Sequence, residues 1–177
     1  KLTDSWQVAA SYTSKGYLTK MDKFEYLLPE NGSMDLAANS LLATSYQLND
    51  VTLAFDYARW FWDDTRAYGN PGVSTAGIPG STAGPGFGWQ NQHLYRLGAS
   101  WRVNEDWTLR AGYSYATKLV DQADTYLNLL APAANRRHAT LGLTYTLPNG
   151  SEMSAAYAKS FKETIHGEGL APDALTD

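Results

Sequence analysis

Hydrophobic and polar residues alternate along four stretches of the chain. In residues 51–57, 107–115 and 139–147 the odd positions are hydrophobic or aromatic and the even positions are polar or small. Residues 6–12 alternate in the same way, with the hydrophobic residues at even positions. Successive side chains of a β-strand point to opposite faces, so each stretch predicts a strand with one apolar and one polar face.

A unit of strand, short turn and strand occurs three times, in residues 46–57, 101–113 and 145–157. Each copy has an aromatic residue before the turn, two to four turn-forming residues and then a new alternating run, as expected of a β-hairpin. Asn149-Gly150 is the strongest turn signal. These repeats indicate neighbouring antiparallel strands.

The pattern predicts seven strands, and long connections join their other ends. The strands are expected near residues 5–24, 38–48, 51–62, 89–103, 107–118, 135–147 and 151–165. The connections span about 25–36, 63–88 and 119–134. Short turns on one side and long loops on the other are typical of outer-membrane barrels, whose strands need roughly 9 to 11 residues to cross the bilayer. We therefore predict an all-β fold, an antiparallel transmembrane β-barrel segment, with residues 1–177 as one partial domain.

Alternation by itself also fits a soluble β-sandwich or a lipocalin-like barrel, in which the apolar face would be a core. Two features favour the membrane: the small polar residues of the other face suit a wet lumen, and sandwiches rarely have such one-sided loops. In addition, Tyr46, Trp101, Trp107 and Tyr145 all lie within five residues of a short turn. Such clustering predicts an aromatic girdle at the membrane interface.

Composition narrows the possibilities further. The 12 Tyr and 6 Trp against 5 Phe suit surfaces that are half apolar and half wet. The chain has no Cys, which removes disulfides, thiolate metal sites and cysteine nucleophiles. A net charge of −4 argues against a nucleic-acid partner. No apolar run approaches the roughly 18 to 20 residues of a spanning helix.

No catalytic or metal-binding pattern stands out, so we expect no enzyme and no cofactor. His93, His138 and His166 lack metal-ligand spacing and are more simply polar lumen or rim residues. The Gly-rich residues 77–88 follow no strand-to-helix pattern that would cradle a phosphate, which predicts a flexible loop. No Ser/His/Asp set is evident.

Five residues are predicted to point into the lumen and are candidates for ligand binding: Asp56, Trp60, Arg96, Arg102 and Arg110. An Arg in a lumen can pair with a fatty carboxylate while aromatic side chains line its tail. The alternative is a salt-bridge ladder that only satisfies the wall, for instance between Arg110 and Asp56.

Three motifs carry a resemblance to a known family. Trp89-Gln90 precedes a strand that contains Arg96-Leu97-Gly98, and Trp107-Thr-Leu-Arg110-x-Gly112 follows the next turn. This hairpin resembles the FadL-type outer-membrane family of long-chain fatty acid and hydrocarbon transporters, and the resemblance extends to residues 39–62 and 136–161.

The resemblance implies that the chain holds strands seven to thirteen of a fourteen-stranded barrel. The N-terminal plug, the lateral opening and the closing strand would lie outside it, and residues 169–177 are expected to be loop. The chain would then be either a fragment or a natural truncation.

By the same resemblance the complete barrel would carry out passive transport of long-chain fatty acids or aromatic hydrocarbons across the outer membrane of a Gram-negative bacterium. Its partners would be a hydrophobic ligand, outer-membrane lipid, and the remaining strands and plug. Phe24, Tyr26, Leu27 and Leu28 would contribute to an outer groove that first collects the ligand. An ordinary strand end with a proline stop explains these four residues equally well. The alternative function is a structural or adhesive barrel that transports nothing.

Overall fold

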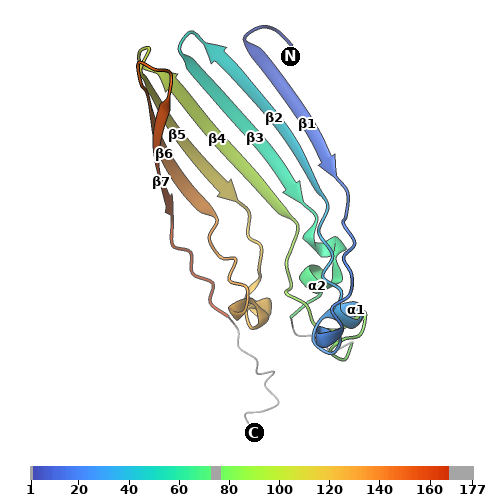
Figure 1. Ribbon diagram of the computed structural model, residues 1–177. Helices are drawn as coiled ribbons and strands as arrows, with labels where there is room; N and C mark the ends of the chain where they lie inside the picture. Colours follow the sequence, from blue (N-terminus) through green and yellow to red (C-terminus); the bar gives the residue numbers. More distant parts are fainter. Residues whose placement is uncertain (1, 73–76, 168–177) are drawn as a thin grey trace.

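The computed structural model describes residues 2–72 and 77–167 and contains the seven predicted strands in one sheet (Figure 1). The strands are β1 (Trp6–Thr13), β2 (Asn39–Leu48), β3 (Val51–Trp60), β4 (Gln92–Arg102), β5 (Trp107–Ala116), β6 (Arg137–Thr146) and β7 (Glu152–Ser160). Each strand is antiparallel to the next along the chain, so the spatial order is the sequence order. The sheet is curved and open, with β1 at one edge and β7 at the other.

Short turns join β2 to β3, β4 to β5 and β6 to β7, and they lie together at the top of Figure 1. Leu48 pairs with Val51 across the first turn, and Thr146 pairs with Glu152 next to the last one. Asn49 and Gly150 have φ values of 50° and 80°, the left-handed region that tight turns require and that Asn and Gly tolerate best. The turns thus fix the registers of their hairpins.

Two strands, β1 and β7, end five or more residues earlier than the alternation predicts. The first was expected to reach residue 24, but β1 ends at Thr13, beyond which the ladder continues only as one bridge between Gly16 and Leu36. Beside that bridge, Lys15 Nζ turns to Asp35 Oδ2 at 3.4 Å. The last strand ends at Ser160 instead of 165, because Glu163 leaves the ladder to pair with Arg136. The predicted loop at 169–177 lies outside the described residues.

The long connections form a layer of short helical turns at the other end of the sheet. These are η1 (Asp22–Phe24), α1 (Pro29–Gly32), η2 (Trp62–Asp64), α2 (Arg66–Gly69), η3 (Gln122–Asp124) and η4 (Leu127–Leu129). No helix among the described residues is long and apolar enough to cross a membrane. The buried hydrophobic residues also belong to this end: Ala37, Ala38, Ala58, Ala67, Leu119 and Val120. The small core therefore lies at the loop end of the sheet, with Ala58 of β3 among its residues.

The Gly-rich residues 77–88 form a loop, as predicted, and this loop makes backbone hydrogen bonds to its neighbours. Asn31 N donates to Gly80 O at 2.8 Å, and Phe87 N donates to Ala67 O at 2.9 Å. Trp89 N, which follows directly, donates to Tyr68 O at 2.7 Å. Because its backbone groups form hydrogen bonds with other loops, the segment is an ordered part of the loop layer.

Candidate functional site

One face of the sheet, which we call the outward face, is apolar and uncovered. Register places Leu53, Ala99, Ala111, Leu141 and Tyr157 in one row across β3 to β7. Leu141 is 64% exposed and Tyr157 is 65% exposed. An apolar surface of this extent would be costly in water and is what a lipid-facing wall requires.

The residues of the predicted aromatic girdle all lie on this outward face. Tyr46 pairs with Trp6 of β1, and Trp107 pairs with Tyr145 with ring centroids 4.6 Å apart. Trp101 is on the same face and pairs with Leu109. Large amphipathic rings thus mark the short-turn edge of the apolar surface.

The opposite face, here the inner face, is small and polar. One of its rows is Ala54, Gly98, Gly112 and Thr140. All five predicted lumen residues belong to it by register: Asp56, Trp60, Arg96, Arg102 and Arg110. The five residues therefore share one face of the sheet, opposite the apolar one.

The inner-face charges pair differently from the expected ladder. Arg96 Nε lies 3.4 Å from Asp56 Oδ2, its direct neighbour across β3 and β4. The suggested pair of Arg110 with Asp56 is wrong, since Arg110 Nη1 instead donates to Thr144 Oγ1 at 2.6 Å. Thr144 Oγ1 in turn shares a hydrogen bond of 2.9 Å with Ser154 Oγ. Within the described residues, Arg110 has no acidic partner.

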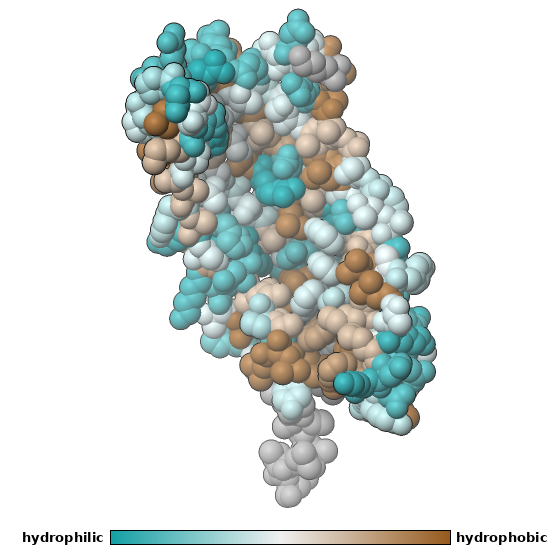
Figure 2. All heavy atoms as spheres, in the orientation of Figure 1, coloured by the Kyte–Doolittle hydropathy of each residue, from teal (hydrophilic) through white to brown (hydrophobic). Residues whose placement is uncertain are grey.

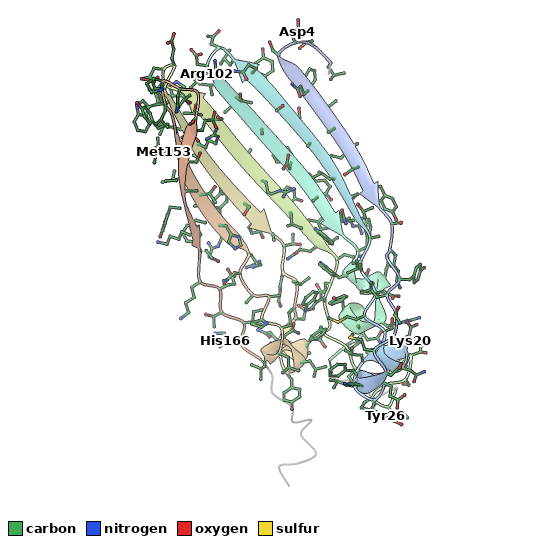
Figure 3. All side chains as sticks on the ribbon, viewed as in Figure 1. Asp4, Lys20, Tyr26, Arg102, Met153 and His166 are labelled. Carbon is green, nitrogen blue, oxygen red and sulfur yellow. The ribbon has the colours of Figure 1, made fainter. Side chains whose placement is uncertain are left out.

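The five residues do not converge on one site. Arg102 lies at the short-turn end of the sheet (Figure 3). Trp60 is the last residue of β3, at the loop end, and its ring stacks on Trp62 with centroids 5.1 Å apart and an interplanar angle of 9°. The inner face therefore offers separate positions along a path.

Trp60 begins an aromatic cluster that the sequence analysis did not identify. Its members come from β3 and the following connection: Trp60, Trp62, Tyr68, Phe87 and Trp89. Burial in this cluster raises the pKa of Tyr68. The sequence signal is the presence of six aromatic residues in residues 60–89, a stretch that is otherwise rich in Gly and Pro.

Asn128, in the connection of residues 119–134, forms hydrogen bonds with this cluster. Its Oδ1 accepts a hydrogen bond of 2.6 Å from Trp89 Nε1, and its Nδ2 donates to Phe87 O at 2.6 Å and to Asp124 O at 2.8 Å. Asn128 is only 9% exposed, so these bonds satisfy groups that water cannot reach easily. The side chain thus holds two long connections together.

The three long connections meet around an apolar depression, here the loop hollow. It is lined by Leu27, Leu28, Ala67, Pro85, Gly86, Phe87, Leu127 and Leu130. Figure 2 shows hydrophobic side chains gathered at this end of the molecule, at the bottom of the view. The hollow has a volume of about 40 Å³, room for a few methylene-sized groups.

Two of the four predicted outer-loop residues line the loop hollow, Leu27 and Leu28. Phe24 is 48% exposed and is not part of the lining. Tyr26 is 79% exposed and lies at the outer tip of the loops (Figure 3), where a hydrogen bond and the charge of Glu25 raise its pKa. Leu27 and Leu28 are therefore the two of the four that lie at the hollow.

An antiparallel wall with an uncovered apolar face, a small polar face, short turns on one side and long loops on the other defines a segment of a transmembrane β-barrel. The family model described as "Outer membrane protein transport protein (OMPP1/FadL/TodX)" matches residues 1–168. The chain therefore belongs to this outer-membrane family of Gram-negative bacteria. A search of curated proteins found no significant match.

Solved structures of this family have the same fold. A monoaromatic hydrocarbon channel, the TodX deltaS2S3 mutant, is 23% identical and has a TM-score of 0.62, covering 94% of this chain and 43% of its own. The toluene transporter TodX of Pseudomonas putida is also 23% identical, with a TM-score of 0.55 and coverages of 89% and 40%. A FadL homologue of Pseudomonas aeruginosa is 20% identical, with a TM-score of 0.62 and coverages of 90% and 41%. The chain thus spans about two fifths of the length of these proteins.

Proposed function

We propose that this chain forms part of a larger outer-membrane barrel that carries hydrophobic compounds passively from the outside inward. The compounds are long-chain fatty acids or aromatic hydrocarbons. The loops that line the hollow face the exterior, because long loops of such barrels are extracellular and short turns periplasmic. The remaining strands and a plug would complete the barrel.

The loop hollow is the observation that carries this proposal. Burying apolar surface away from water is favourable by about 25 cal/mol of free energy for each Å². An apolar depression at the outer end therefore provides a first binding site for a hydrophobic molecule. The cavity accepts only part of a ligand, and Leu129 and Ile78, each 77% exposed, extend the apolar surface of the loop end. Binding there is consequently weak, which suits a site that must release its ligand onward.

The inner face supports a ligand with a carboxylate head. Arg96 is balanced by Asp56, whereas Arg110 points to the same lumen with only hydroxyl partners among the described residues. A fatty carboxylate can offer Arg110 a charge-assisted hydrogen bond that a hydrocarbon such as toluene cannot. Fatty acids are therefore the ligands that this half of the wall favours, and hydrocarbons would pass without using Arg110.

Uptake into liposomes tests the proposal. The complete barrel would be reconstituted, and entry of a labelled long-chain fatty acid and of labelled toluene would be followed. The double variant L28S/L127S, which makes the hollow polar, is expected to slow entry of both ligands several-fold. Leu18→Ser is the control, because Leu18 is 49% exposed, lies outside the hollow lining and should leave the rate unchanged when replaced. If the unaltered barrel moves neither ligand, the structural or adhesive alternative is correct.

A further inference from the structure

The outward face changes character where its strands approach the long loops. Its strand residues include four basic side chains, Arg59, His93, Arg137 and Lys159, and no Asp or Glu among the described strands. Each of these four residues is one of the two residues that end its strand on the side of the long loops. Together with Tyr57, Tyr95 and Tyr115 they form what we call the loop-end belt.

Strand register makes the loop-end belt continuous. Arg59 pairs directly with His93 across β3 and β4, and Tyr115 pairs with Arg137 across β5 and β6. Lys159 pairs with Ala139, two residues further along β6. The strands of such barrels tilt by about 35 to 45°, so residues at one membrane depth shift along neighbouring strands in this way.

The short-turn edge of the same face provides the contrast. Its outward residues include Trp6, Trp101 and Trp107, and no Lys, Arg or His lies there among the described strands. Basic side chains that merely snorkel out of an apolar band would be expected at both edges. Cations confined to one edge indicate that the headgroups on that side are anionic.

The belt cations are only partly neutralised. The Arg59 guanidinium lies 4.8 Å from the Phe61 ring centroid, and its Nε is buried and has no hydrogen-bond partner in the described part of the chain. Lys159 Nζ lies over the Phe161 ring at 5.6 Å. These aromatic contacts hold the two cations in place without cancelling their charge.

At the other end of the belt, the carboxylate of Glu163 contacts two arginines. Glu163 Oε2 lies 3.5 Å from Arg137 Nη2, but its Oε1 is also bonded by Arg136 Nη2. One carboxylate between two guanidinium groups leaves a net positive charge. His93 is held by a hydrogen bond of 2.7 Å between its Nδ1 and the Tyr57 hydroxyl.

Each end of the belt lies next to an apolar hollow of the outward face. The first hollow, of about 440 Å³, adjoins Arg59 and His93 and is lined by Val8, Ala9, Ala10, Leu42, Ala43, Thr44, Phe55 and Tyr57. The second, of about 630 Å³, is lined mainly by Trp101, Leu109, Leu141, Leu143, Ala155 and Tyr157, and it comes nearest the belt at Tyr157, two residues before Lys159 on β7. Cations therefore lie where a headgroup would be, and grooves lie where acyl chains would be.

We propose that the loop-end belt binds the phosphate groups of the anionic glycolipid of the outer leaflet, with its acyl chains in the adjoining hollows. Arg guanidinium groups match phosphate oxygens bidentately, and Lys and the tyrosine hydroxyls add point contacts. Neighbouring strands are about 4.8 Å apart, so the Arg59–His93 and Arg137–Lys159 ends of the belt are separated by roughly 10 Å from β4 to β6. A headgroup with two phosphates can contact both.

Lipid retention measures this binding. The complete barrel would be incubated with purified lipopolysaccharide, with the same glycolipid after enzymatic removal of its phosphates, or with inorganic phosphate, and bound lipid would be counted by native mass spectrometry. The variant R59Q/K159Q is expected to retain the phosphorylated glycolipid at least about tenfold less well than the unaltered barrel, since each basic residue near an anionic surface contributes substantially. The dephosphorylated lipid should bind both proteins equally weakly.

Two further variants separate binding from folding. R59K/K159R keeps both charges and is expected to retain the lipid, whereas K20Q/K23Q removes two exposed loop cations outside the belt and should bind as the unaltered barrel does. Retention by R59Q/K159Q equal to that of the unaltered barrel would overturn the proposal. So would equal binding of the dephosphorylated glycolipid, or displacement of the lipid by equimolar inorganic phosphate, which would indicate a simple anion site.

Discussion

Arg96 Nε lies 3.4 Å from Asp56 Oδ2 on the inner face, and this cross-strand pair balances the charge of one of the three inner-face arginines. The side chains are 48% and 33% exposed, so water screens the pair and its contribution to folding is small. Its effect on ligands is larger, because it decides which arginine can meet a carboxylate.

Asp56→Asn is therefore expected to increase the affinity of the complete barrel for a fluorescent fatty acid several-fold, because it frees the Arg96 guanidinium. The free energy of unfolding should change by less than about 1 kcal/mol. The double variant D56N/R96Q should return to the original affinity. An affinity that stays unchanged in Asp56→Asn would show that Arg96 does not meet the ligand.

Arg110→Gln should slow fatty acid uptake by about fivefold and leave toluene uptake unchanged. The reason is that only the carboxylate uses the charge-assisted hydrogen bond of Arg110, and such bonds are worth more than neutral ones. Arg110→Lys, which keeps the charge, is the matched control and should recover part of the rate. Equal slowing of both ligands would instead indicate a structural role, for example through Thr144, which accepts the Arg110 hydrogen bond.

Acid should loosen the contact between the end of β7 and the start of β6. The hydrogen bond from Arg136, followed by the charges of Arg136 and Arg137, holds the pKa of Glu163 below its usual 4.5. A carboxylate whose pKa is depressed by folding stabilises the folded state above its unfolded pKa, and this contribution is lost as the pH falls through the lower folded value.

We expect the protection factors of the backbone amides of residues 161–164, measured by hydrogen exchange, to fall below about pH 4.5 in the unaltered protein. In Glu163→Gln the protection should already be low at pH 7 and should change less on acidification. Glu105→Gln, an exposed turn residue, is a suitable control. Equal pH dependence in the unaltered protein and Glu163→Gln would contradict this assignment.

Asn128→Ala should destabilise the loop layer by about 1 to 3 kcal/mol, the usual cost of leaving buried polar groups without partners. It removes the acceptor of Trp89 Nε1 and the donor to Phe87 O. Limited proteolysis should then cut the connections near residues 85–90 faster, while cleavage at the short turns stays the same. Gln122→Ala, at an exposed loop position, should leave the cleavage pattern as it is.

The alternation of residue types predicted the seven strands, their order, the sides of the turns and loops, and the two faces. This worked because the two-residue period of a strand is a local property, and one shift of register would put every hydrophobic residue on the wrong face. The ends of β1 and β7 were harder, since Lys15 and Glu163 leave the ladder for partners that are distant in sequence.

The sequence by itself thus determined a membrane wall with Asp56, Trp60, Arg96, Arg102 and Arg110 on its inner face. Only the tertiary structure decided that Asp56 pairs with Arg96 instead of Arg110, because the pairing depends on the register between β3 and β4, which a long connection joins. The contacts within the loop layer were likewise decided only by the tertiary structure. Its hollow, the aromatic cluster and the Asn128 contacts join residues from three connections, and no local pattern records which loops will meet.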